Sequence, residues 1–190
     1  ELSPNNMAKV VDARATKDVA EDSLAEAERN TRWAGEQVEL TRSNLKVART
    51  ELDDAKLAMV TAERSGTVSQ LAKAKQAHEY SMARTDEVRE RLALRKREFE
   101  LAKLAQKLAL EEFRLRSAQV ELQKAESVQE LDRVAAKQIS VKDYRKQVRF
   151  HETEVELANV RMAAMSSEVH EARKEYEVYR VKAEALKTGN

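Results

Sequence analysis

The chain has 190 residues, of which 36% are charged and only 4% aromatic, with three glycines, one proline and no cysteine. This composition is typical of long helices and coiled coils, and it excludes disulfides, thiolate metal sites and a Gly-rich phosphate loop. The 35 basic and 34 acidic residues give a net charge of +1, which does not favour nucleic-acid binding, and no run approaches the ~20 apolar residues of a membrane span.

The first predicted helix covers residues 4–64. Ser3 is a good N-cap, and Pro4 suits the first helical position, where its missing N–H costs nothing. Every seventh residue from Val10 and from Ala13 belongs to a continuous seam, and the second of these columns is almost entirely alanine. Small residues allow two helices to approach closely, so we expect a tight antiparallel partner, although alanine is also simply a favoured helix former.

Two glycines mark special positions in and after this helix. Gly35 costs about 1 kcal/mol relative to alanine in a helix interior, so it indicates a bend or a close contact. The first turn is predicted over residues 64–70. Gly66 suits the left-handed residue that ends a helix, and Thr67 with Gln70 forms a capping box for the next one.

The second predicted helix covers residues 68–138, and two adjacent apolar columns give it a wide face that suits contact with two neighbours. Its end is predicted from a second turn, at which Ser140 caps a third helix over residues 141–187, with Asp143 three residues further on. The alternative is one uninterrupted helix over residues 68–187, because this range contains neither glycine nor proline.

The third helix has the most regular seam in the chain. Its two seam columns over residues 141–186 are apolar across seven heptads, with His151 as the one polar member. Such a stripe has to be buried on another helix. We therefore predict an all-α fold, an elongated antiparallel coiled coil of three helices in a single domain of residues 1–190. Helix 3 would cover residues 94–138, leaving a three-helix base and a two-helix stalk over residues 40–92.

The sequence predicts no catalytic, cofactor-binding or metal site. Each of the three histidines precedes a glutamate, but none has a second histidine four residues on, the spacing of a zinc-protease helix. For His151, a hydrogen-bonded core histidine is the simpler interpretation and a pH-responsive role is the alternative. We expect a non-enzymatic protein without cofactors, small-molecule substrates or nucleic-acid partners.

A run of basic residues in the second helix is the one charge feature above background. It consists of Arg89, Arg91, Arg95, Lys96, Arg97, Lys103 and Lys107. Together with the chain length and helix count, this run resembles the membrane-bending BAR domains, which are dimers of three-helix coiled coils. That resemblance implies contact with anionic lipid and a peripheral position on the cytoplasmic membrane. The simpler interpretation is ion pairing within the coiled coil.

The residues around the two turns carry a second resemblance. The first turn is Arg64-Ser65-Gly66-Thr67-Val68-Ser69-Gln70, followed by Ala72 and Ala77, and the second is Arg133-Val134-Ala135-Ala136-Lys137-Gln138-Ile139-Ser140, followed by Asp143-Tyr144. An arginine, a small-residue turn and a Val/Ile-Ser pair before a heptad helix resemble the helical hairpins of bacterial periplasmic adaptor and outer-membrane efflux proteins.

This second resemblance implies a periplasmic or envelope setting, with contacts between a helical tip and another coiled coil. The tip consists of Ser65, Gly66, Thr67, Val68 and Ser69. We therefore expect a structural scaffold or adaptor whose partner is another protein or a second copy, bound through coiled-coil surfaces. The chain begins at Glu1 rather than at methionine, from which we expect a processed or trimmed product.

Overall fold

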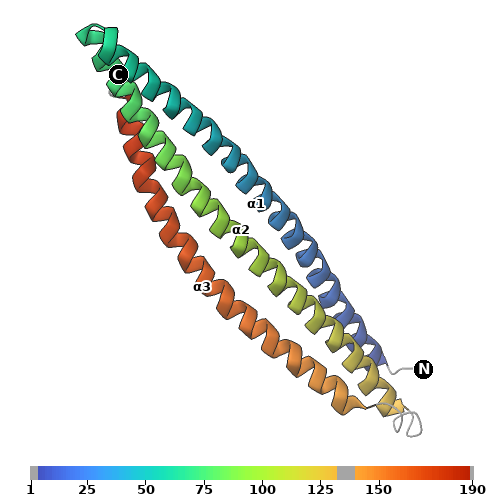
Figure 1. The fold of residues 1–190 in the computed structure, drawn as a ribbon. Helices are drawn as coiled ribbons and strands as arrows, with labels where there is room; N and C mark the ends of the chain where they lie inside the picture. Colours follow the sequence, from blue (N-terminus) through green and yellow to red (C-terminus); the bar gives the residue numbers. More distant parts are fainter. Residues whose placement is uncertain (1–3, 132–139, 189–190) are drawn as a thin grey trace. The chain divides into compact units, whose positions relative to one another are not determined.

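The computed structural model describes residues 4–131 and 140–188. This part of the chain forms three long α-helices, α1 (Pro4–Ser65), α2 (Val68–Leu131) and α3 (Val141–Thr188), as the sequence predicts (Figure 1). The predicted bounds of the first and third helices agree with the structure to within one residue. The Ser3 cap and the predicted helical residues 132–138 lie outside the described residues.

The chain divides into two compact units, each containing one segment of every helix. Unit 1 consists of Glu1–Thr31 and Ala102–Ala164, and unit 2 consists of Arg32–Leu101 and Met165–Asn190. Each unit has its own buried apolar residues.

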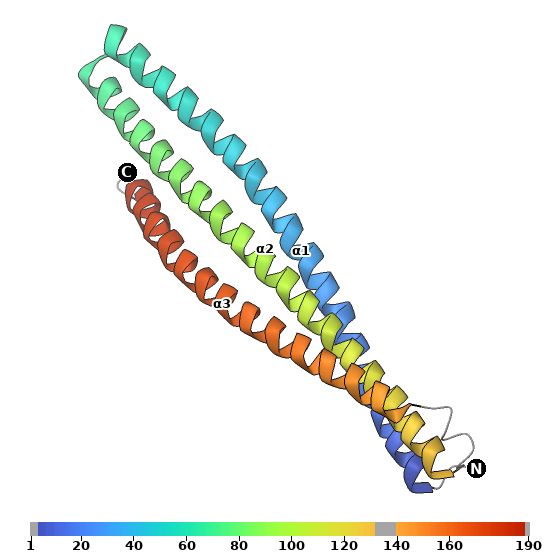
Figure 2. The same cartoon turned by 60° about the horizontal axis from the view of Figure 1, so that its bottom comes forward.

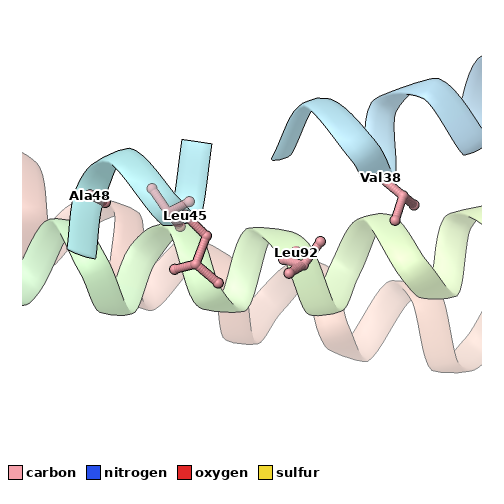
Figure 3. Close-up of a cluster of buried hydrophobic side chains, with 5 residues drawn as sticks. Val38, Leu45, Ala48 and Leu92 are labelled. Carbon is pink, nitrogen blue, oxygen red and sulfur yellow. The ribbon is translucent and has the colours of Figure 1, made fainter. Parts of the chain in front are cut away.

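In unit 2, α1 and α2 run antiparallel and share one apolar cluster. Buried side chains of α1 point toward α2 in the close-up of this cluster (Figure 3). Its members are Val38, Leu45, Ala48, Val88 and Leu92, with Phe99 packed against them. Val38 and Leu45 thus lie beside Leu92, which is the pairing produced by folding the chain back at the first turn.

The alanine column of α1 allows the two helices to approach closely. Thr85 of α2 is only 2% exposed, and its hydroxyl donates a hydrogen bond of 3.2 Å to the backbone carbonyl of Ala48 on the facing helix. A side chain as short as threonine reaches a neighbouring backbone only where the helices are close. At Gly35, an added Cβ would lie 3.3 Å from the Phe99 ring. The tight partner and the close contact at Gly35 are therefore confirmed.

The helix α3 packs on α2 in unit 2, where α2 lies between α1 and α3 in both views (Figures 1 and 2). The buried residues Leu94, Val169 and Ala172 form the core of this contact, with Leu101 and Tyr176 packed against it. The seam predicted for the third helix therefore faces α2.

The predicted extent of the two-helix stalk is wrong. Ala183 and Lys187, near the end of α3, line the same hollow as Tyr80 of α2, so α3 covers α2 well beyond residue 94. The hydroxyl of Tyr176 donates a hydrogen bond of 3.2 Å to Glu87, which shows the same displacement of α3 along α2. The stretch of hairpin without α3 is correspondingly shorter.

In unit 1, α2 again contacts both other helices. Leu115, Ala118 and Val148 form the buried cluster between α2 and α3, with Leu122 and Val155 packed against it. On α1, the hydroxyl of Thr31 donates to the carbonyl of Ala102 at 3.1 Å, and the ammonium of Lys17 lies 5.3 Å from the centre of the Phe113 ring. Lys17, a polar member of the α1 seam, therefore has an aromatic partner.

The second turn separates two helices that run antiparallel. Arg145 of α3 donates a hydrogen bond of 2.8 Å to Glu126 of α2, a contact that one uninterrupted helix would forbid. Ser140 precedes α3, and its carbonyl accepts a bond of 2.9 Å from the backbone N–H of Asp143. A hydrogen bond with the Ser140 side chain and the nearby Lys146 lower the pKa of the Asp143 carboxyl. The predicted cap is therefore present.

Gly66 serves a different purpose from the predicted one. No glycine among residues 4–131 and 140–188 has a positive φ, so the left-handed ending predicted for α1 is wrong. A Cβ on Gly66 would instead lie 2.5 Å from the carbonyl oxygen of Ala62, which accepts the hydrogen bond of the Gly66 N–H at 2.9 Å. Glycine is required at this turn because the backbone passes too close for a side chain.

We predict that Gly66→Ala lowers the free energy of unfolding by about 1–3 kcal/mol, because backbone at the turn has to move away from the added methyl group. Urea unfolding followed by circular dichroism measures the change. Gly35→Ala is the matched control, since its Cβ meets only a ring edge at 3.3 Å and alanine favours a helix interior. Equal losses in the two variants would contradict the prediction.

A second prediction concerns the cap of α3. The pKa of Asp143 is lowered in the folded state, so its carboxylate stabilises the fold at neutral pH, and this stabilisation is lost as the pH falls through the folded pKa. Asp143→Asn should therefore be less stable than the wild type at pH 7 and equally stable well below pH 3.8, the ordinary value. Urea midpoints at the two pH values test this, and a pH-independent difference would refute it.

Candidate functional site

The tip of the α1–α2 hairpin in unit 2 is a short turn with several local hydrogen bonds. Thr67 caps α2: its backbone N–H donates to the side chain of Gln70 at 2.8 Å, and the N–H of Gln70 donates to the hydroxyl of Thr67 at 3.3 Å. The N–H of Leu71 also donates to the carbonyl of Thr67 at 3.0 Å. The predicted capping box is confirmed, and its two bonds satisfy backbone N–H groups at the start of α2.

Apolar side chains at this tip project into solvent. Val68 is 88% exposed and Leu57, two turns before the end of α1, is 67% exposed. The hairpin of α1 and α2 extends past the end of α3 (Figure 2), and Val68 is closer to the turn than Tyr80, which lines a hollow with the end of α3. Of the predicted tip residues, all five lie together here and all five are exposed.

Beside the turn, α1 and α2 enclose an open hollow of about 630 Å³. Its apolar lining comes mainly from alanines, whose small side chains leave the space between the helices unfilled. The lining includes Leu57, Ala58, Ala62, Ser65, Gly66 and Ala74. Exposed apolar residues around a concave surface are typical of protein-binding sites.

The predicted basic run does not form one uniform surface. In unit 2, Arg95 donates to Glu98 at 2.6 Å, and Arg97 lies 3.8 Å from Glu175 of α3. Arg89 is paired with an acidic residue of its own helix at 2.6 Å. The exposed Arg89 and Lys96 share one heptad position, while Arg91 and Arg97 border α3. Lys103 and Lys107 belong to unit 1, where both are exposed.

The seam histidine has a buried carboxylate as its partner in unit 1. The side chain of Glu111 is 6% exposed, with one oxygen 3.4 Å from Nδ1 of His151 and the other accepting from Arg114 at 2.7 Å. The predicted hydrogen-bonded core histidine is thus observed. Glu111 was not singled out from the sequence, although it lies on the side of α2 that α3 covers.

The described part of the chain contains neither a cluster of metal-ligating side chains nor a helix apolar enough to span a membrane. Residues 4–131 and 140–188 contain no group of three or more histidine, aspartate or glutamate side chains placed to hold a metal ion. In the same residues, none of the helices has an apolar run long enough to cross a bilayer.

Comparisons with known proteins add no family to this picture. No protein-family model, no curated protein and no solved structure matches the chain.

We predict that Glu111→Ala lowers the free energy of unfolding by about 1–3 kcal/mol, because hydrogen bonds to a buried charged group are lost and its space is left unfilled. Glu112→Ala, at the neighbouring and more exposed position, should change it by less than about 0.5 kcal/mol. Urea unfolding of both variants provides the comparison. An equal loss of unfolding free energy in Glu111→Ala and Glu112→Ala would show that the buried contact stabilises the fold no more than an exposed glutamate does.

Proposed function

We propose that this protein is a non-enzymatic coiled-coil scaffold or adaptor of the bacterial cell envelope, and that it binds a helical partner protein through the tip of the α1–α2 hairpin. The observation that carries the proposal is the exposed apolar pair Leu57 and Val68 beside the alanine-lined hollow of the tip. Burial of apolar side chains of this size lowers the free energy, and at the end of the hairpin a partner has to supply that burial.

The hollow suits the side chains of another helix. Ala58, Ala62 and Ala74 present small side chains, so a larger apolar residue of a partner could fill the space between α1 and α2. Binding in this manner places the apolar face of a helix into a groove between two others. The capping bonds of Thr67 and Gln70 hold the turn in place beforehand, which reduces the ordering cost of association.

The envelope setting is supported by the residues of the turns. The segment from Arg64 to Gln70 resembles the hairpin turns of periplasmic adaptor and outer-membrane efflux proteins, which meet another coiled coil at their helical tips. Cell fractionation of the source organism with an antibody against the chain tests this part. Detection with the periplasmic or envelope fraction is expected, and recovery with the cytoplasmic fraction alone would refute it.

An alternative function is binding of an anionic membrane through α2. It is favoured by Arg89 and Lys96, which are exposed at the same heptad position, and by the exposed Lys103 and Lys107 of unit 1. Each basic residue near an anionic surface contributes about 1 kcal/mol. Against it, Arg89, Arg95 and Arg97 already have acidic neighbours, which reduces their attraction for lipid.

We predict that Val68→Glu and Leu57→Glu each abolish capture of the partner from an envelope extract by immobilised protein, because a carboxylate cannot be buried in an apolar contact. Both positions are solvent-exposed, so helicity measured by circular dichroism should not change. Val178→Glu, at an exposed valine of α3, is the matched control and should leave capture intact. Capture that survives both tip substitutions would refute the tip as the contact.

Co-sedimentation with anionic and neutral liposomes at two salt concentrations separates the alternatives. The proposal predicts no pelleting with either vesicle. Salt-sensitive pelleting with anionic vesicles that is lost in Arg89→Glu and Lys96→Glu would replace the adaptor with a membrane-binding protein, since exposed charge contacts are screened by salt.

A further inference from the structure

A second coiled-coil seam runs along α1 in unit 2, on a side that the fold does not cover. Trp33, Leu40 and Val47 follow one another at intervals of seven residues, and each side chain is more than half exposed. Gln37 and Asn44 lie between them, so that the five positions alternate in steps of four and three. This is the spacing of the a and d positions of a coiled coil, with amides at a and apolar residues at d.

The second seam is distinct from the one that faces α2. The α2-facing seam includes Val38 and Leu45, which are buried, whereas the second seam lies on the flank next to it. Within residues 4–131 and 140–188, the side-chain amides of Gln37 and Asn44 take part in no hydrogen bond. The tertiary structure therefore leaves the apolar positions uncovered and the amides available.

The charges of α1 are distributed in keeping with a contact on this flank. The flank opposite the second seam carries Arg32, Glu39, Arg42, Lys46 and Arg49. The outward positions beside the seam are instead Glu36, Ser43 and Thr50, with one charge among the three. None of the five seam residues is charged, so the seam and these positions together hold one charge among eight residues, in a chain of which 36% is charged. Such a local depletion matches the cores of protein interfaces, where charged residues are scarce.

We infer that this seam is the contact for a second copy of the chain, paired with its own α1 in parallel and in register. The inference rests on the proposed function as a scaffold that works through helix–helix contacts, but it uses a surface separate from the tip. Parallel pairing places a opposite a and d opposite d. Gln37 then meets Gln37, Asn44 meets Asn44, and the apolar residues meet their equivalents.

The amides are the reason for choosing a second copy in this orientation. A carboxamide has both donors and an acceptor, so it can satisfy an identical carboxamide across a two-fold axis. In an antiparallel pair, a positions pack beside d positions, and the amides of Gln37 and Asn44 would be buried against apolar side chains. Amides at a positions are also known to define the register and number of strands in coiled coils.

A seam of about two heptads would be too short to hold two isolated helices together, because the helices would first have to form. Here α1 is already ordered by its packing on α2 through Leu45 and Ala48. The ordering cost is thus absent from the association step. A parallel dimer would also carry two hairpin tips, which raises the avidity for a partner with two binding sites.

Sedimentation equilibrium and tryptophan fluorescence test the pairing on the full chain. The mass should rise from 21.6 kDa to twice that value with concentration, and emission from Trp33, the only tryptophan, should shift to the blue in parallel. Leu40→Glu should raise the dimer dissociation constant by about a hundredfold, because a buried apolar layer is lost from both copies. Val178→Glu is the control and should dimerise normally.

Cysteine cross-linking tests the orientation, since the chain has no cysteine of its own. Asn44→Cys should form a disulfide-linked dimer on mild oxidation, because equivalent a positions of a parallel pair come within disulfide reach. The control Glu39→Cys, on the charged flank, should not. In an antiparallel pair, where a positions meet d positions, a mixture of Asn44→Cys and Leu40→Cys would cross-link and Asn44→Cys alone would not, which would overturn the proposed orientation.

The remaining outcomes separate this inference from the proposed function. A monomer at all concentrations, or a dimer that is unaffected by Leu40→Glu, overturns the second seam while leaving partner capture by the tip intact. A dimer that persists in Val68→Glu and is lost in Leu40→Glu supports the seam independently of the tip.

Discussion

The close approach of α1 to α2 is the contact on which the other features depend. In unit 2 it is made possible by small residues such as Ala48, to whose carbonyl Thr85 donates a hydrogen bond across the interface. In unit 1 the pair Thr31 and Ala102 makes the same kind of contact. Val38 and Leu45 fill the contact beside these small residues. Leu40 and its heptad equivalents lie on another side of α1 and remain exposed.

The helix α2 contacts two neighbours, and this explains the chemistry of its surface. Apolar columns on adjacent faces are covered by α1 and α3, as Leu92 and Leu94 show. Its charged residues consequently lie on the solvent side and along the borders with its two neighbours, where Arg97 meets Glu175 of α3 and Arg84 meets Glu51 of α1. A basic run in the sequence is therefore divided among different surroundings. An adaptor that works through helix packing is consistent with this distribution.

Local patterns predicted most of the fold. The heptad columns of α1 and α3, the capping box at Thr67 and Gln70, and the cap at Ser140 are confirmed because each depends on residues within a few positions of one another. Gly66 also correctly indicated a turn, but the predicted reason for the glycine was wrong. Both a left-handed backbone and a backbone that passes close to another atom require a glycine. Only coordinates distinguish the two.

By itself, the sequence determined that the chain is helical, where the first turn lies, where the third helix begins and which faces of the helices are apolar. The tertiary structure decided how far α3 extends along α2, reaching Tyr80, and which apolar residues remain exposed. The reason is that sliding one coiled-coil helix by whole heptads leaves the same columns facing each other. The pattern therefore cannot choose among such alignments, and the choice falls to side-chain packing, such as that of Val148 against Leu115 and Ala118.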